Sequence, residues 1–367
     1  MSDDRVFMKG NHAACEGAYR AGCKAYFGYP ITPQNEVTEY MSAHIWEHGG
    51  TFIQSESEIA AINMIMGASA AGARAMTSSS SPGISLKQEG LSYIAMMELP
   101  MVVMNVVRCG PGLGNIAPHQ GDYFQATKGG GHGDYRLITL APNSVQEMAQ
   151  YVYDAFNLAD KWRNPAMVLT DGTIGQMMEP VDYTSMPWME PPDKSEWQLD
   201  EFQDGRKRHV LTSIWLDPAD MAVAHEKLIA KYDKLKKEEV RYSEYRTDDA
   251  ELLVVAIGSP SRVTHSAIRI LRQEGLKVGL LRPITVWPFP YSAIREYADS
   301  KHVKAILVPE MNWGQMIEDV KLAVLDKKPL HFVPKHGGLT FTPEDLTEPI
   351  RAILENPDNP DTLWRVS

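Results

Sequence analysis

Short, almost continuous runs of apolar residues alternate with longer helical stretches along the first half of the chain. Five such runs lie near 24–27, 74–77, 101–107, 135–140 and 166–170. The stretches between them, such as 10–22 and 145–160, have the length and periodicity of helices. Strands that are buried on both faces lack the polar alternation of half-exposed strands. The order of elements therefore predicts an α/β domain built on a doubly wound parallel sheet.

A second, smaller α/β unit is predicted after a charged segment. Residues 185–220 are rich in proline, tryptophan and charge, and 222–242 has the pattern of a helix with interleaved acidic and basic residues. A strand–helix–strand repeat follows at 251–258, 262–274 and 278–281. We predict one domain at 1–245, which includes the charged helix as an arm and linker, and another at 246–367.

Composition narrows the class of protein. The 367 residues are 44% hydrophobic and carry a formal net charge of −11, which disfavours nucleic acid and anionic membranes as partners. The start of the chain does not resemble a signal peptide, and no apolar run is long enough to span a bilayer, so a cytoplasmic protein is expected. Cys15, Cys23 and Cys109 lack the spacing of a metal or iron–sulfur site. We therefore expect no metal site in this chain.

Two polar side chains stand where the pattern would allow a ligand. Thr32 lies in a proline-flanked turn that follows the first apolar run, and open α/β sheets bind ligands at strand ends. Glu58 opens a helix that is apolar almost all round, which suggests that its carboxylate is drawn into the interior or an interface. The alternative for Glu58 is structural, as the last residue of a capping box that begins at Ser55.

Arg108 follows the run at 101–107 and could offer a planar, permanently charged fork to a carboxylate, although structural ion pairs are the commoner role of a single arginine. The pattern Gly112-x-Gly114-x-x-Ala117 imitates a dinucleotide-binding loop. Pro118 argues against this, because the fingerprint needs a helix to begin within the glycines, and we predict an irregular loop. His119 and His132 lie outside any ligand-spaced cluster, which disfavours metal binding.

Several strings in one order resemble the α subunit of the 2-oxoacid:ferredoxin oxidoreductases, and most closely the 2-ketoisovalerate (branched-chain) type. The resemblance runs essentially from end to end, and the C-terminal unit is similar to the family's smaller transketolase C-terminal-like domain. The strings are KGN at 9–11, GYPITPQNE at 28–36, TSSSSPG at 77–83, GPGLG at 110–114, GGGHGD at 129–134 and PEMNWGQ at 309–315.

The resemblance implies thiamine diphosphate as the cofactor, with this chain on its pyrimidine side and a β subunit holding the diphosphate and Mg²⁺. The chain agrees with that division, because it contains no Gly-Asp-Gly, with which the diphosphate and metal signature begins. The 4Fe-4S clusters are expected on a partner subunit, and ferredoxin or another acceptor would dock there. The implied partners are thus the β, γ and cluster-bearing subunits, the 2-oxoacid and coenzyme A.

The family's site residues carry over by motif. Glu58 resembles the carboxylate that hydrogen-bonds the aminopyrimidine, Thr32 a substrate contact and Arg108 the anchor of the 2-oxoacid carboxylate. Pro30 and Ser81 are implied as further cofactor contacts. The implied reaction is the oxidative decarboxylation of a 2-oxoacid to acyl-CoA, CO2 and reduced ferredoxin.

The substrate is less well defined than the reaction. A 2-ketoisovalerate-like acid is favoured, because a branched aliphatic chain needs only apolar walls, whereas 2-oxoglutarate would need a second cation and an aryl glyoxylate a wider slot. Lys87, Lys128 and His119 are candidates for that cation. Cys109 and His119 depart from the family pattern near the expected pocket. A non-catalytic scaffold subunit remains the alternative from another class, and it would tolerate Glu58→Gln.

Overall fold

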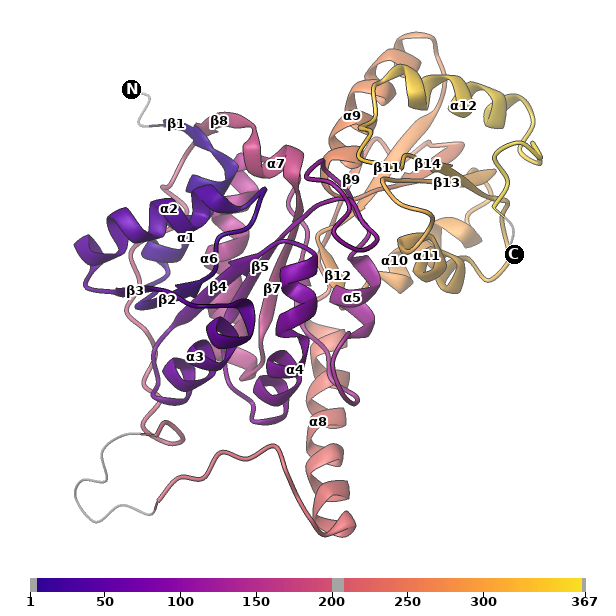
Figure 1. The fold of residues 1–367 in the computed structure, drawn as a ribbon. Coiled ribbons are helices and arrows are strands. Elements are labelled where there is room, and N and C mark those ends of the chain that lie inside the picture. The colour runs from indigo at the N-terminus through magenta and orange to yellow at the C-terminus, as the bar shows by residue number, and fades with distance from the viewer. Residues whose placement is uncertain (1–4, 200–207, 365–367) are drawn as a thin grey trace.

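The computed structural model describes residues 5–199 and 208–364, which form two α/β lobes that lie side by side (Figure 1). The first lobe is built on a seven-stranded sheet and the second on a five-stranded sheet. Among the described helices, none has the length and apolar character needed to cross a bilayer.

The sheet of the first lobe has the order β12-β6-β7-β5-β4-β2-β3, and all neighbouring strands are parallel except β12 and β6. This confirms the predicted doubly wound sheet. Its strands are β2 (Ala25–Gly28), β3 (Thr51–Gln54), β4 (Ala75–Ser79), β5 (Val102–Val107), β6 (Ile138–Leu140), β7 (Ala166–Asp171) and β12 (Thr285–Trp287). A separate antiparallel pair, β1 (Val6–Lys9) and β8 (Met178–Val181), flanks the sheet.

Helices cover both faces of this sheet, as the continuous apolar runs predicted. They are α1 (Gly10–Arg20), α2 (Asn35–His44), the 3-10 helix η1 (Ile45–His48), α3 (Glu58–Ala70), α4 (Pro82–Met96), α5 (Tyr123–Lys128), α6 (Val145–Trp162) and α7 (Gly172–Gln176). Along β5, Val103 and Val107 belong to the core cluster that includes α3 and α4, whereas Val102, Met104 and Val106 belong to the cluster that includes α1 and α6. Successive side chains of one strand thus serve two cores.

The sheet of the second lobe has the order β14-β13-β10-β11-β9, with only β9 antiparallel to its neighbour. Its strands are β9 (Tyr242–Tyr245), β10 (Leu252–Val255), β11 (Val278–Pro283), β13 (Ala305–Glu310) and β14 (Leu330–Pro334). Its helices are α9 (Gly258–Gln273), α10 (Tyr291–Asp299), α11 (Met316–Val324) and α12 (Glu344–Glu355). The predicted strand–helix–strand repeat is β10, α9 and β11.

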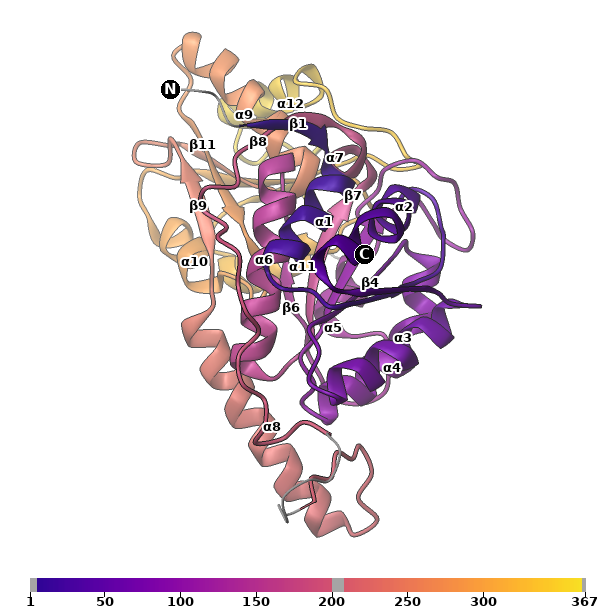
Figure 2. The same cartoon turned by 90° about the vertical axis from the view of Figure 1, so that its left-hand side faces the viewer.

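The charged helix α8 (Pro218–Glu238) extends beyond both sheets (Figures 1 and 2). The prediction that it continues to residue 242 was wrong, because Tyr242 already begins β9. Lys227 and Lys231 of α8 pair with Glu98, which ties the helix to the first lobe. The segment between β11 and α10 also returns to the first lobe, where its strand β12 pairs with β6 at the edge of the first sheet.

Buried polar groups join the two lobes. The Asp171 carboxylate accepts hydrogen bonds from the backbone N–H groups of Thr173 and Ile174 in α7, and from that of Ser259 in α9 at 2.9 Å. One side chain therefore caps helices of both lobes. Burial raises the pKa of Asp171. The Gln120 amide completes the junction by accepting from Met311 N at 3.0 Å and donating to Ile257 O at 3.1 Å.

Candidate functional site

Thr32, Ser81 and Arg108 come together at the carboxyl edge of the first sheet. Each follows the end of a parallel strand: β2, β4 and β5 respectively. The Arg108 guanidinium donates to Thr32 O at 3.1 Å, and Arg108 N donates to Ser81 Oγ at 3.0 Å. The strand-end positions predicted for Thr32 and Arg108 are present, and the structure adds that these two residues and Ser81 contact one another.

Ser81 holds an unusual backbone conformation at the start of α4. Its φ of 24° is positive, which is uncommon for a residue with a Cβ atom and requires support from its surroundings. Asn105 Oδ1 accepts from Ser81 N at 3.2 Å, and Ser81 Oγ donates to Asp122 Oδ2 at 2.7 Å. Burial raises the pKa of Asp122. The Ser81 hydroxyl thus supports Arg108, and its contact with a cofactor stays a prediction.

Glu58 is the first residue of α3, and the capping-box hypothesis for it was wrong. The N-cap is Ser57, whose Oγ accepts from Ala60 N at 3.2 Å, so Glu58 lies two positions too early to close a box. The helix therefore begins two residues later than the Ser55 pattern requires. Glu58 is only 6% exposed, yet its carboxylate makes no hydrogen bond or ion pair with any residue that the structure describes. A buried carboxylate in this state is available to a ligand.

Glycine at position 83 makes room beside this carboxylate. A Cβ atom on Gly83 would stand 2.1 Å from Ser79 Oγ and 2.6 Å from Glu58 Oε1, so a larger residue would displace both. The hydroxyls of Ser79 and Ser80 are buried and also lack a partner within the described part of the chain. The unpartnered Ser79 hydroxyl and the Glu58 carboxylate thus lie close together beside Gly83. They suit a heteroaromatic ring that carries both donors and acceptors, such as an aminopyrimidine.

Lys87 lies beneath Glu58. Its side chain is fully buried, and its ammonium donates to Thr77 Oγ1 at 3.1 Å and to Glu58 O at 3.5 Å. Burial lowers the pKa of Lys87 to about 7, opposed by the charge of Glu58. Lys87 was one of three candidates for a second substrate-binding cation. Its ammonium instead faces the protein between β4 and α3.

A cavity of about 780 Å³ opens beside Ser81 and between the two lobes. The first lobe contributes the start of α4, the glycine-rich loop and His119, and the second contributes Asn312, Trp313 and His336. None of the described lysines and arginines lines it. Burial lowers the pKa of His119, and the neighbouring His336 lowers it further by a smaller amount. Lys128 lies elsewhere, with its ammonium 2.5 Å from Asp319.

Not every predicted residue faces this cavity. Of the five proposed from sequence, Ser81 alone lines it, while Pro30 is exposed in the turn before Thr32. Arg108 contacts the cavity wall indirectly: its Nη2 donates to the carbonyl of Leu113, which lines the cavity, at 3.2 Å. The contributions of Asn312 and Trp313 were missed, because the string that contains them was recognised only as a family motif.

The glycine-rich loop excludes the dinucleotide interpretation. Between the end of β5 at Val107 and the start of α5 at Tyr123 there is no helix, and Arg108 pairs with Pro118 in an isolated bridge. Gly114 has a φ of 56°, and a Cβ atom there would lie 1.7 Å from Cys109 O, so the loop folds back tightly on itself. The predicted irregular loop is confirmed. Within residues 5–199 and 208–364, no group of three or more His, Cys, Asp or Glu could hold a metal ion.

A doubly wound domain with a buried carboxylate that has no described partner, joined to a smaller α/β lobe, is the arrangement of a ligand-binding subunit with its site at the strand ends. Residues 16–244 match the family model described as pyruvate flavodoxin/ferredoxin oxidoreductase, thiamine diphosphate-binding, and residues 250–346 match pyruvate:ferredoxin oxidoreductase core domain II. The chain belongs to the pyruvate flavodoxin/ferredoxin oxidoreductase family, which confirms the resemblance seen in the sequence.

Curated relatives match nearly the whole chain. It is 49% identical over 346 residues to ketoisovalerate oxidoreductase subunit VorB of Methanothermobacter thermautotrophicus, covering 94% of this chain and 97% of that protein. It is 38% identical over 370 residues to 2-oxoglutarate synthase subunit KorA of Methanocaldococcus jannaschii, covering 95% and 99% respectively.

A solved structure agrees with these relatives. The 2-oxoglutarate:ferredoxin oxidoreductase from Magnetococcus marinus, with 2-oxoglutarate, coenzyme A and succinyl-CoA bound, matches with a TM-score of 0.81 and 29% identity. The match covers 95% of this chain and 65% of that chain. A split-gene transketolase, at 11% identity and a TM-score of 0.56, supports the fold alone.

Proposed function

We propose that this chain is the α subunit of a thiamine-diphosphate-dependent 2-oxoacid:ferredoxin oxidoreductase that acts on a branched-chain 2-oxoacid similar to 2-ketoisovalerate. The products would be acyl-CoA, CO2 and reduced ferredoxin. The observation that carries the proposal is Glu58, a buried carboxylate without a partner among the described residues, in a chain of a thiamine-diphosphate-binding family.

Glu58 is proposed to hydrogen-bond a ring nitrogen of the aminopyrimidine. A carboxylate in this position can share a proton with the ring and so select the tautomer that acts as a base. When bound, thiamine diphosphate supplies a nucleophilic carbon and an acceptor for the electrons of the bond that breaks. Gly83 leaves the space that such a ring needs, and the Ser79 hydroxyl, which has no partner among the described residues, offers a polar atom beside it. Pro30 and Ser81 are proposed to border the same ring.

Arg108 is proposed to anchor the substrate carboxylate. Both of its Nη atoms donate to backbone carbonyls, at 3.1 and 3.2 Å, and no described carboxylate pairs with it. Its charge is therefore uncompensated and fixed in direction, as binding of an oxoacid requires. Because Thr32 O receives one of these hydrogen bonds, the turn and the arginine hold each other in place, with the Thr32 side chain as a substrate contact.

The cavity favours an aliphatic over a dicarboxylic substrate. We propose that the oxoacid carboxylate lies at Arg108, behind the part of the cavity wall that Leu113 forms, and that the rest of the substrate extends into the cavity. No described lysine or arginine lines the cavity itself, and the lowered pKa of His119 favours its neutral form, so the second carboxylate of 2-oxoglutarate would find no permanent cation there. The higher identity to a ketoisovalerate oxidoreductase subunit than to the KorA proteins agrees with this preference. His119 would help shape the cavity wall, whereas Cys109 is buried and does not line it.

Partner subunits are proposed to cover the carboxyl edge. Leu113, Ile116 and Trp313 are 78%, 63% and 78% exposed around the cavity, and large apolar side chains gathered in this way mark contact surfaces. A β subunit would cover them and hold the diphosphate and Mg²⁺. Its γ and cluster-bearing companions would complete a cytoplasmic complex, with the 4Fe-4S clusters and the acceptor site outside this chain.

The proposal is tested by coenzyme-A-dependent viologen reduction with the complex purified anaerobically through this chain. The panel would contain 2-ketoisovalerate, pyruvate, 2-oxoglutarate and phenylglyoxylate. We expect the highest kcat/KM with 2-ketoisovalerate. A preference for 2-oxoglutarate would overturn the substrate assignment, and no reduction with any acid would favour a scaffold subunit.

A further inference from the structure

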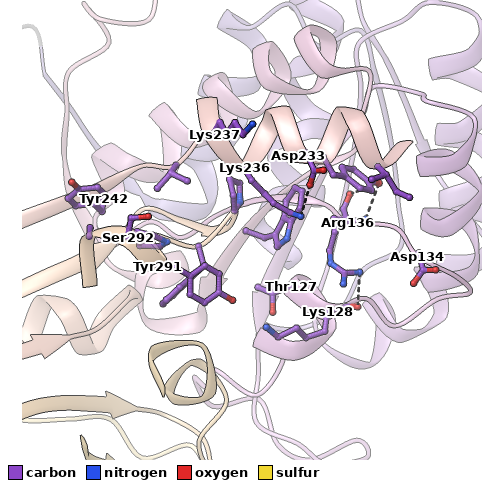
Figure 3. A pocket seen from close by; sticks show the side chains of 18 of the residues that line it. Thr127, Lys128, Asp134, Arg136, Asp233, Lys236, Lys237, Tyr242, Tyr291 and Ser292 are labelled. Carbon is purple, nitrogen blue, oxygen red and sulfur yellow. Dashed lines mark hydrogen bonds and ion pairs between the residues drawn. The ribbon is translucent and has the colours of Figure 1, made fainter. Parts of the chain in front are cut away.

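A second cavity, of about 730 Å³, lies away from the candidate site (Figure 3). Its walls come from the end of α5, the segment before β6, the C-terminal half of α8, β9, and the segment from β12 into α10. Because β6 is parallel to β7 and β7 to β5, residues that precede β6 lie at the amino edge of the sheet. Thr32, Ser81 and Arg108 lie at the opposite, carboxyl edge.

An uncompensated guanidinium stands in this cavity. Arg136 is partly buried, and its Nη1 donates to Tyr135 O at 2.7 Å and to Lys128 O at 3.4 Å. Among the described residues, no carboxylate lies within ion-pair distance of it. A guanidinium that is held by backbone carbonyls keeps its full charge and a fixed direction, which are the properties of an anion receptor.

The other cations of the cavity differ in their pairing. Lys128 and Lys236 are compensated by Asp319 and Asp233, at 2.5 and 3.1 Å. Lys237 is exposed and makes no ion pair within the described part of the chain. Figure 3 shows Lys237 on the α8 side of the cavity, away from Arg136. Arg136 is therefore the principal anchor for an anion, and Lys237 adds to the field at the edge.

Aromatic side chains form much of the remaining wall. Trp287, Phe289 and Tyr291 follow one another along the segment that leads into α10, and Tyr242 of β9 is 41% exposed on the same cavity. Figure 3 shows the Tyr291 ring lying across the cavity from Arg136. Flat apolar rings beside a fixed cation match a ligand that combines a planar ring with an anionic group.

We propose that this cavity binds a nucleotide. Arg136 would pair with a phosphate, the planar base would lie against the aromatic wall, and Asp134 and Glu296, which also line the cavity, could accept hydrogen bonds from sugar hydroxyls. The volume lies within the ordinary range of small-molecule sites, about 300–1,000 Å³. The site is independent of the proposed oxidoreductase chemistry and would serve as a second, non-catalytic ligand site.

The test is equilibrium dialysis of the purified complex with radiolabelled ATP, with AMP and inorganic phosphate as competitors. We expect saturable binding that Arg136→Gln weakens by about tenfold or more. The loss of a hydrogen bond to a charged group changes the binding free energy enough to lower the affinity by that factor. Tyr242→Ala should weaken ATP binding and leave the weak competition by phosphate unchanged. Lys237→Gln should weaken binding more than Lys234→Gln, a matched loss of charge on the same helix outside the cavity.

Three results would overturn the assignment. They are no saturable ATP binding at millimolar concentration, binding that Arg136→Gln leaves unchanged, and competition by inorganic phosphate as strong as that by AMP. A structure of the complex with a partner segment seated in the cavity would replace the nucleotide with a protein contact. Viologen reduction by Arg136→Gln should equal that of the unmodified complex, which separates this site from the proposed reaction.

Discussion

The buried ammonium of Lys87, next to Glu58, gives a quantitative prediction of how stability depends on pH. Its ammonium is fully buried, and its pKa falls from 10.5 to about 7 because burial disfavours the charged form. The unfolded chain keeps this proton up to the ordinary pKa, whereas the folded chain releases it near 7. Since unfolding then takes up a proton, stability due to this group rises with pH between about 7 and 10.5.

The magnitude follows from these two pKa values. At pH 7 the lowered pKa of Lys87 costs the folded chain about 4 kcal/mol relative to a neutral side chain, and at pH 9 about 2 kcal/mol. Methionine fits a similar space without a charge, but the Thr77 hydroxyl would lose its partner, at a cost of about 1–3 kcal/mol. We therefore expect Lys87→Met to raise the free energy of unfolding by about 2 kcal/mol at pH 7.

Urea unfolding of the purified chain at pH 7 and pH 9 measures this difference. The advantage of Lys87→Met should shrink by about 2 kcal/mol between the two pH values. Lys234→Met, which replaces a side chain that is 68% exposed, controls for the substitution itself and should show little change. A destabilised Lys87→Met at pH 7, or an advantage independent of pH, would refute the lowered pKa.

Three further substitutions probe the site and the junction of the lobes. Gly83→Ala should weaken thiamine diphosphate binding at least tenfold in a calorimetric titration of the complex, because its Cβ meets two polar side chains, whereas Gly67→Ala, with open space around it, should not. Asp319→Asn should lower the melting temperature, since the carboxylate is buried and receives an ion pair and two tyrosine hydrogen bonds, whereas the exposed Glu318→Gln should have little effect. Arg282→Lys should destabilise the chain to urea by about 1–3 kcal/mol, because lysine cannot reproduce its bidentate pairing across the lobes.

The central strands could be predicted because burial on both faces leaves a continuous apolar run. β5 and β7 lie within one residue of their predicted bounds. The edge strand β3 was missed, because three of its four residues are exposed and its sequence lacks that signal. β12 was missed because its three residues pair with a sheet far away in sequence. Local patterns thus find the interior of a sheet more easily than its edges.

In the candidate site, too, some features have a local sequence signal and others depend on long-range packing. The meeting of Thr32 and Arg108 could be predicted, because residues that follow parallel strands share one edge. The N-cap of α3 could not be, since Ser55 and Ser57 both fit the helix-start pattern and only the backbone decides between them. The burial of Lys87 gave no local signal, and neither did the approach of Asn312 from the second lobe. Long-range packing determines both.

The most direct test of the proposed chemistry is the turnover of 2-ketoisovalerate by the complex that carries Glu58→Gln, beside Glu56→Gln as a matched change at an exposed position two residues away. Glutamine fills the same space but cannot exchange a proton with the pyrimidine. We predict that kcat for Glu58→Gln falls by about 100-fold or more, in line with the usual contribution of acid–base catalysis, while Glu56→Gln keeps full activity. Unchanged turnover by Glu58→Gln would contradict the assignment of this carboxylate and favour a scaffold role for the chain.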